Sequence, residues 1–290
     1  MDQKLNKFGL PSLVIISLLA ASAEPLLVKI GFQRGYSLLS MLFFRNIIAC
    51  LTALLFVRKG GLPQLSSLIK IFPLALLLFT VNACILFSLQ FMTISSILII
   101  IATTPLFVAL TNQFLGRDLL QKFFWIGLGV SFIGICLSVG IMEGLPAFPK
   151  QGFLALLLAI LCSTTYRVYM ESVAKKIPPV QISFCIFSIN GLLTVACVPF
   201  FKESLNWEAL SIATWTGIAA VLANIAFISS VKLIGATRMS IMDMLQRPLI
   251  MIAAIFILEE YLTMMQITGC VLTLAGTQLT RIKERSITEG

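Results

Sequence analysis

The sequence predicts an all-α integral membrane protein whose ten transmembrane helices form two inverted five-helix repeats. Composition, the spacing of the apolar runs and an internal repeat predict this fold. Of the 290 residues, 59% are hydrophobic and 11% are charged, whereas a soluble domain carries about 45 to 50% apolar and about 25% charged residues. A spanning helix needs about 20 apolar residues, so ten spans use about 200 residues and leave room only for loops and tails.

Ten apolar runs are long enough to cross a bilayer. They cover residues 10–30, 38–57, 69–90, 95–114, 123–141, 152–173, 180–201, 211–231, 239–258 and 264–280. The first run follows Lys4 and Lys7 and contains Ala21-Ser22-Ala23, a pattern that is also typical of a cleavable signal peptide. Apolar residues resume after Glu24, so we interpret this run as a membrane helix that stays in the protein.

The basic residues indicate the orientation in the membrane. With the N-terminus inside, fourteen of the 21 lysines and arginines fall in the inner segments, four in the outer segments and three within spans. Cytoplasmic loops carry the excess of positive charge. We therefore expect a multi-pass protein of the cell (inner) membrane with both termini in the cytoplasm.

The two halves of the chain resemble each other at an offset of 142 or 143 residues. The equivalent positions are Asn82 and Asn224, Asp118 and Glu260, Gly127 and Gly269, Gly134 and Gly276, and Pro105 and Pro248. We assign one repeat to residues 1–145 and the second to residues 146–290. Because each repeat has an odd number of spans, the second copy enters the membrane from the opposite side, as in proteins that alternate access to a site near the midplane.

Several classes of chemistry are excluded or disfavoured. The chain has no histidine, which removes histidine-activated nucleophiles and the metal sites that use imidazole. Its seven cysteines form no C-x-x-C pair and lie in apolar runs, as small core residues do. We expect no enzyme activity, no cofactor and no metal. The net charge of +9 follows membrane topology and forms no patch for nucleic acid.

The stretch from Asn82 to Asp118 contains the motifs Thr93-Ile94-Ser95, Thr104-Pro105-Leu106 and Gly116-Arg117-Asp118. A second copy of the stretch runs from Asn224 to Glu260, and Phe43-Phe44-Arg45 lies in the second run. With these motifs the chain resembles the EamA branch of the drug/metabolite transporter superfamily, of which the stretch from Asn82 to Asp118 is the characteristic segment. This chain has Arg117-Asp118 where the family usually shows Gly-Glu. It also has Asp243 and Arg247 in a helix that carries few charges in the family. The resemblance implies a central cavity lined by spans 1, 3, 4, 6, 8 and 9, with spans 5 and 10 as scaffold.

Charged residues inside the spans are the first candidates for substrate binding, because charge within a bilayer is costly and normally faces a cavity or a partner. Glu24 and Arg45 lie at similar depths near the outer side and could meet. On the inner side, Arg167 and Glu171, and Asp243 and Arg247, are each four residues apart and share a helix face. For each set, a structural ion pair is the alternative to substrate contact, and Glu171 is near enough to the surface to be solvated.

Uncharged residues complete the candidate site. Asn82 and Asn224 face the cavity or bond to another helix, and Tyr166 beside Arg167 serves as a stacking surface or a core aromatic. Pro25, Pro105 and Pro248 are candidate gating residues that could let their helices bend. The small residues at helical spacing in the fifth and tenth runs predict close helix packing; they are Gly127, Ser131, Gly134, Gly269, Thr273 and Gly276.

We expect a secondary transporter that works by alternating access. The mixed charges of the candidate site favour, as its substrate, a zwitterionic or charged organic metabolite such as an amino acid or an S-adenosylmethionine-like molecule. Export of amphipathic or toxic metabolites is the alternative, with Glu24 and Asp243 supplying the charge. A membrane receptor or a structural protein is the alternative outside transport. The expected partners are the small-molecule substrate and the lipid bilayer, with a homodimer as a further option.

Overall fold

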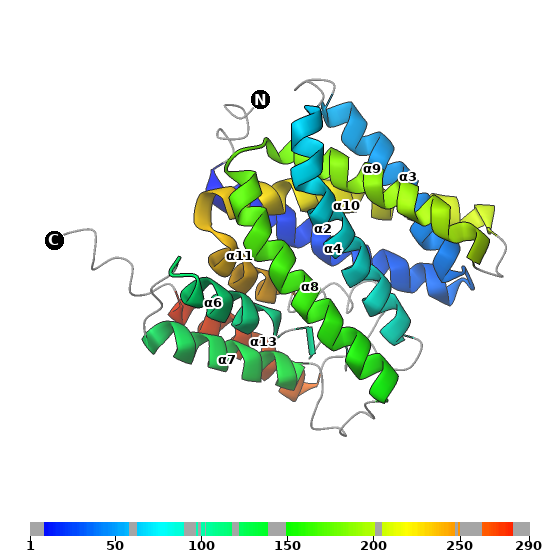
Figure 1. Ribbon diagram of the computed structural model, residues 1–290. Coiled ribbons are helices and arrows are strands. Elements are labelled where there is room, and N and C mark those ends of the chain that lie inside the picture. The colour runs from blue at the N-terminus through cyan, green and yellow to red at the C-terminus, as the bar shows by residue number, and fades with distance from the viewer. Residues whose placement is uncertain are drawn as a thin grey trace. The chain divides into compact units, whose positions relative to one another are not determined.

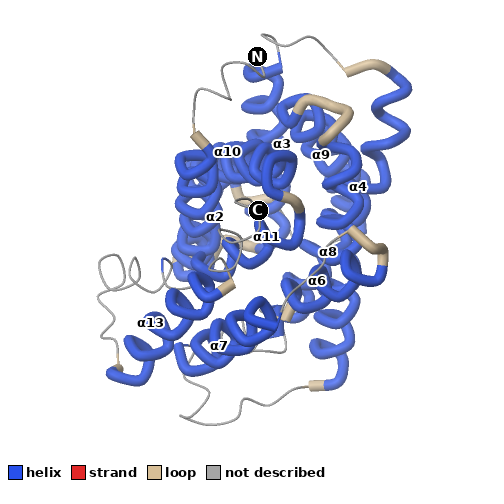
Figure 2. The backbone as a smooth tube through the Cα atoms, turned by 90° about the vertical axis from the view of Figure 1, so that its left-hand side faces the viewer, coloured by secondary structure: helices blue, strands red, loops and turns tan. Residues whose placement is uncertain are grey.

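The computed structural model describes residues 9–57, 63–89, 97, 100–101, 103–117, 122–138, 149–200, 205–246, 249 and 263–280. Every regular element in this part of the chain is a helix (Figures 1 and 2). The α-helices are α2 (Leu10–Gln33), α3 (Leu38–Val57), α4 (Leu65–Leu89), α6 (Thr104–Phe114), α7 (Lys122–Ser138), α8 (Lys150–Ala174), α9 (Pro179–Cys197), α10 (Leu210–Ile234), α11 (Ala236–Met242) and α13 (Met264–Leu279). Short 3₁₀ helices are η2 (Val198–Phe200), η3 (Trp207–Ala209) and η4 (Asp243–Leu245). The predicted all-α class is confirmed.

Six segments among the described residues are long and apolar enough to cross a membrane. They are Leu10–Val28, Leu39–Val57, Ser66–Ile85, Lys150–Ala174, Pro179–Cys197 and Trp207–Ile234. Two shorter apolar helices, Lys122–Leu137 and Ile267–Leu279, coincide with the fifth and tenth predicted runs. Much of the fourth and ninth runs lies outside the described residues, so the count of ten spans stays a prediction.

The chain divides into two compact units, and each unit takes residues from both halves of the sequence. The first unit comprises Met1–Phe79 and Tyr169–Gly235, and the second comprises Thr80–Val168 and Ala236–Gly290. Helices α4 and α8 contribute residues to both units. The spatial units therefore differ from the two sequence repeats.

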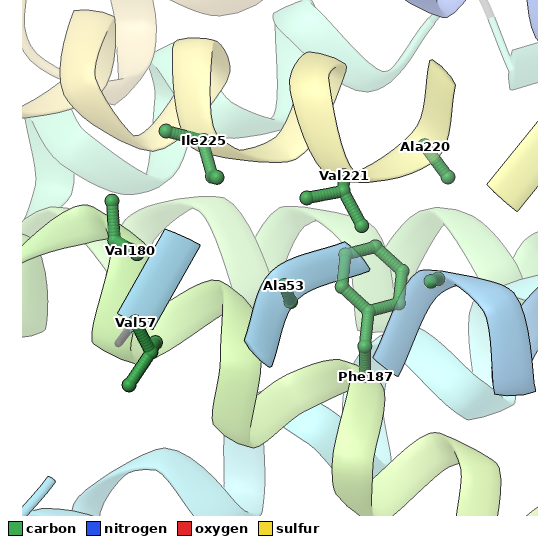
Figure 3. Close-up of a cluster of buried hydrophobic side chains, with 8 residues drawn as sticks. Ala53, Val57, Val180, Phe187, Ala220, Val221 and Ile225 are labelled. Carbon is green, nitrogen blue, oxygen red and sulfur yellow. The ribbon is translucent and has the colours of Figure 1, made fainter. Parts of the chain in front are cut away.

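In the first unit, α3, α9 and α10 pack around a cluster of buried side chains (Figure 3). In this cluster, Phe187 of α9 lies near Ala53 of α3 and Val221 of α10. The small alanine side chains on this face of α3 leave space, which larger side chains of α9 and α10 fill. This packing holds the helix that carries Arg45 against two others.

Equivalent helices of the two sequence halves run antiparallel in both units. In the first unit, Asn46 of α3 contacts Thr194 of α9, whereas Cys50, one turn later on α3, contacts Ser188, which lies earlier on α9. In the second unit, α7 and α13 lie side by side (Figure 1). There, Gly127 faces Gly276 and Gly134 faces Gly269.

The contacts between α7 and α13 are related by a local two-fold axis. The repeat offset converts Gly127 into Gly269 and Gly134 into Gly276, so it exchanges one glycine contact for the other. A Cβ atom at Gly127 would lie 2.7 Å from the carbonyl oxygen of Gly276, and one at Gly134 would lie 2.7 Å from that of Gly269. Only glycine permits this approach of the two main chains. The close packing predicted for these small residues is confirmed.

Candidate functional site

Glu24 of α2 and Arg45 of α3 form an ion pair in the first unit. The Arg45 side chain is 11% exposed and the Glu24 side chain 27%. Phe44, next to Arg45, is buried against Ala209 and Ile212 and anchors this end of α3. A Cβ atom at Gly217 of α10 would lie 2.8 Å from the Arg45 carbonyl oxygen, so α10 packs closely on α3 at this residue. The ion pair is thus built between tightly held helices.

A chain of polar contacts continues from Arg45 to α9. Arg45 Nη1 donates to Asn46 Oδ1 at 3.2 Å, and Asn46 Nδ2 donates to Thr194 Oγ1 at 2.8 Å. The Thr194 hydroxyl in turn donates to the main-chain oxygen of Asn190 at 2.7 Å. The buried Arg45 Nε and Asn190 Oδ1 have no hydrogen-bond partner within the described part of the chain. The polar contacts thus link residues of α2, α3 and α9.

Arg167 of α8 and Asp243 of η4 form the ion pair of the second unit. Arg167 Nη1 lies 2.5 Å from Asp243 Oδ2 and also donates to Ser240 Oγ of α11 at 3.2 Å. Both charged side chains are about one-fifth exposed, at 21% and 19%. The apolar run that forms α8 places Arg167 within a membrane-length helix, where a bare charge is costly. Asp243 and the Ser240 hydroxyl offset part of that cost.

A second polar contact lies beside this pair on α11. Asn112 of α6 donates through Nδ2 to Thr237 Oγ1 at 2.9 Å. Thr237 and Ser240 are three residues apart and therefore share a face of α11. Just beyond α6, Arg117 Nη1 donates to the Val168 carbonyl oxygen of α8 at 3.1 Å. Asn112 of α6 is thus bonded to α11, and Arg117, just after α6, is bonded to α8.

One of the sequence expectations on charged residues differs from the structure. Glu171 pairs with Lys175 at 3.0 Å, and its side chain is only 12% exposed, so the expectation that it is simply solvated is wrong. Its neighbour one turn later on α8 reaches it, as the i,i+4 geometry allows. Asp243 lies in a 3₁₀ helix and pairs with Arg167. Arg247 lies outside the described residues, so its predicted role with Asp243 stays a prediction.

The uncharged candidates fall in different settings. Asn82 is half-buried on α4, and Asn224 accepts a hydrogen bond from Ser183 Oγ at 2.9 Å, which ties α10 to α9. Tyr166 is buried. Pro25 lies within α2, and Pro105 is the second residue of α6, where proline is compatible with the first turn of a helix. Pro248 is outside the described residues, and a gating role for the three prolines stays a prediction.

Sequence reasoning missed the short polar side chains that complete both ion-pair clusters. These residues are Asn46, Thr194, Asn112 and Thr237. Each is a small polar residue within an apolar helix, and such residues are often helix-to-helix contacts. The Asn46 signal was present in the sequence, directly after Arg45, but nothing in one sequence separates it from an ordinary packing residue.

The chain matches known proteins over most of its length. It matches the EamA-like transporter family over residues 11–140 and 150–282. "Uncharacterized transporter sll1319" of Synechocystis sp. (strain ATCC 27184 / PCC 6803 / Kazusa) is 24% identical to it over 207 residues, which cover 68% of this chain and 62% of that protein.

Thus the chain spans less than two thirds of that curated relative. A solved structure described as "Crystal structure of protein" has a similar fold, with a TM-score of 0.76 at 15% identity, over 93% of this chain and 98% of the other. The match to the family extends through both halves of the sequence and agrees with the resemblance seen in its motifs. The chain belongs to the EamA-like transporter family.

Proposed function

We propose that this protein is a secondary transporter of a small zwitterionic or charged organic metabolite, which is amino-acid-like or S-adenosylmethionine-like. Membership of the EamA-like transporter family supports transport, and the family likeness in both halves supports a duplicated architecture. The observation that carries the substrate class is the ion pair between Arg167 and Asp243 on two different elements of the second unit.

A substrate with both an amine and a carboxylate suits this pair. Its carboxylate would replace Asp243 at the Arg167 guanidinium, and its ammonium group would replace Arg167 at the Asp243 carboxylate. Both protein charges then keep an opposite partner, which matters because an unpaired charge away from water is strongly unfavourable. A neutral substrate would separate the pair without offering a replacement for either partner.

Charge balance argues against the alternative of an amphipathic cation. A cation site needs a carboxylate with spare negative charge, but Glu24 is already matched by Arg45 and Asp243 by Arg167. The two ion pairs each match one positive with one negative charge, and an amino-acid group also carries one charge of each sign. A cation that has no carboxylate would offer no partner to the Arg167 guanidinium that it displaces from Asp243, whereas the amino-acid group of an amino acid or of S-adenosylmethionine offers one.

The proposed mechanism is alternating access by two inverted repeats, each of which has five of the ten transmembrane spans. The antiparallel packing of α3 with α9 and of α7 with α13 supports inversion of the second copy. Inverted repeats provide two similar packings of one fold, which open a central site to alternate sides. Further residues proposed to bind substrate are Arg45, Glu24, Asn82, Asn224, Tyr166 and Arg247.

Flux measurements in liposomes that contain only this protein test the proposal. Radiolabelled amino acids and S-adenosylmethionine inside the vesicles should exchange with the same compound outside at rates above those of protein-free vesicles. Amphipathic quaternary ammonium cations and neutral sugars should not exchange. Flux of the cations alone would replace the zwitterion proposal with the alternative, and no flux of any organic solute would contradict a transport function.

A further inference from the structure

Three buried side-chain oxygen atoms of the second unit have no hydrogen-bond partner among its described residues. They are Oγ1 of Thr104 in the first turn of α6, Oδ1 of Asn112 on α6 and Oγ1 of Thr164 on α8, and the last two belong to residues linked to the Arg167–Asp243 pair by a hydrogen-bonded helix or by helical spacing. Asn112 is fully buried and Thr164 is 6% exposed. Buried polar atoms of native proteins are nearly always bonded to protein, to water or to a ligand, so each such atom requires an explanation.

The contacts of Asn112 determine which half of its amide remains open. Its Nδ2 donates to Thr237 Oγ1 at 2.9 Å, so the open atom is the carbonyl oxygen, which only accepts hydrogen bonds. Thr237 lies one helical turn from Ser240, and Ser240 accepts from Arg167. Three residues of α-helix rise about 4.5 Å. Asn112, whose carbonyl oxygen has no partner, is therefore bonded to α11 about one turn away from the residue that the Arg167 guanidinium contacts.

Thr164 lies on α8, the helix that carries Arg167. It precedes Arg167 by three residues on α8, so the two side chains share a helix face. Side chains on a helix lean toward its N-terminus, which directs the Arg167 side chain over the turn that contains Thr164. The Thr164 hydroxyl can donate or accept a hydrogen bond. An open hydroxyl and an open carbonyl thus accompany one ion pair.

We propose that Asn112 and Thr164 determine specificity by binding a hydroxyl or carboxamide group on the side chain of the substrate. This inference rests on the proposed function, in which the Arg167–Asp243 pair binds the charged groups of a zwitterion. An O–H or N–H of the substrate donates to Asn112 Oδ1, and the Thr164 hydroxyl bonds to the same polar group or to its neighbour. An apolar substrate side chain would leave both buried oxygens unsatisfied, which disfavours its binding.

Matched pairs of amino acids test this inference on the purified full-length protein. The probes are L-threonine with L-valine, L-tyrosine with L-phenylalanine, and L-asparagine with L-leucine, and calorimetry gives the Kd of each. We expect at least one polar member to bind about tenfold more tightly than its apolar partner, as one net hydrogen bond provides. Asn112→Leu and Thr164→Val should each reduce that ratio to about one.

Thr164→Val keeps the shape of the side chain and removes an unsatisfied hydroxyl, so its melting temperature should be equal to or above that of the wild type. Ser230→Ala in the first unit is the matched control, since Ser230 Oγ is also buried and open among the described residues. That variant should keep the wild-type ratio. Equal binding of both members of every pair, or an unchanged ratio in Thr164→Val, would overturn the inference and leave the proposed function standing. If no zwitterion binds to the wild type, the proposed function fails, and this inference fails with it.

Discussion

Arg167 on α8 and Asp243 on η4 hold opposite charges together from two separate helical elements, with 2.5 Å between Nη1 and Oδ2. Ser240 on α11 accepts a second hydrogen bond from the same nitrogen atom. The pair therefore links α8 to the α11–η4 segment within the second unit. A bound zwitterion that separated these charges would also change the contact between the two elements, which is what coupling of binding to movement requires.

Substitutions at this pair separate a binding role from a structural one. Arg167→Gln and Asp243→Asn should each abolish flux in proteoliposomes and lower the melting temperature, because removing one partner of a buried pair costs about 3 to 5 kcal/mol. Partial exposure of both side chains places the expected cost at the lower end. The double variant Arg167→Asp with Asp243→Arg restores an ion pair, so it should recover stability but not flux. Wild-type flux in that double variant would make the pair purely structural.

Lys175→Gln provides the control for loss of an ion pair on the same helix. It removes the partner of Glu171, but the Lys175 side chain is 60% exposed. Exposed pairs contribute about 1 kcal/mol or less. Flux and melting temperature should stay close to the wild type, and a large loss of flux would show that pairing along α8 matters in general.

The glycine contacts between α7 and α13 predict a sharp difference between two alanine substitutions. A Cβ atom at Gly276 would lie 2.6 Å from the main-chain oxygen of Gly127, so Gly276→Ala must push the helices apart, at a cost of about 1 to 3 kcal/mol. A Cβ atom at Gly129 would meet nothing within 4 Å. Gly129→Ala should be neutral or stabilising, because alanine is the better helix former. Thermal unfolding in detergent compares the two, and equal melting temperatures would contradict the close contact.

The sequence predicted the helical class and most helix positions because apolar run length alone determines which segments can cross a bilayer. It also predicted the packing of the fifth and tenth runs, since small residues at helical spacing have few other uses there. The i,i+4 reasoning was less successful for charges. It placed Glu171 with Arg167, one turn earlier, whereas Glu171 pairs with Lys175, one turn later. It also cannot join Arg167 to Asp243, because these residues lie on different elements.

Contacts between helices account for what the sequence could not predict. Asn112 and Thr237 are 125 residues apart, and Asn46 and Thr194 are 148 apart. Their types and spacing are ordinary for polar residues in a helix bundle. These residues meet only because helices of the two halves pack against each other. A repeat offset predicts the order of the helices along the chain, but it does not predict how each helix is rotated about its own axis.

The orientation in the membrane can be tested with single cysteines in a cysteine-free background. Phe148→Cys lies in the segment before α8, and Pro178→Cys lies immediately before α9. The distribution of Lys and Arg predicts that an impermeant thiol reagent outside intact cells labels position 148 and not position 178. Permeabilised cells provide the control, because both positions should then react. Labelling of position 178 alone in intact cells would reverse the assignment of inner and outer sides.

Glu24 is expected to couple transport to protons, because it is a carboxylate in a membrane-length helix whose charge is matched by Arg45 of α3. Through Arg45 and Asn46 the Glu24 carboxylate is linked to α9, so a change at Glu24 can reach contacts between helices. Glu24→Gln mimics the protonated side chain permanently. It should abolish accumulation against a gradient and remove the pH dependence of uptake. Substrate exchange should persist, since exchange needs binding and the conformational change but no net proton movement. Glu208→Gln, at an exposed residue of η3, serves as the control and should keep both activities. Wild-type accumulation by Glu24→Gln vesicles under an imposed pH gradient would assign Glu24 to a structural pair with Arg45.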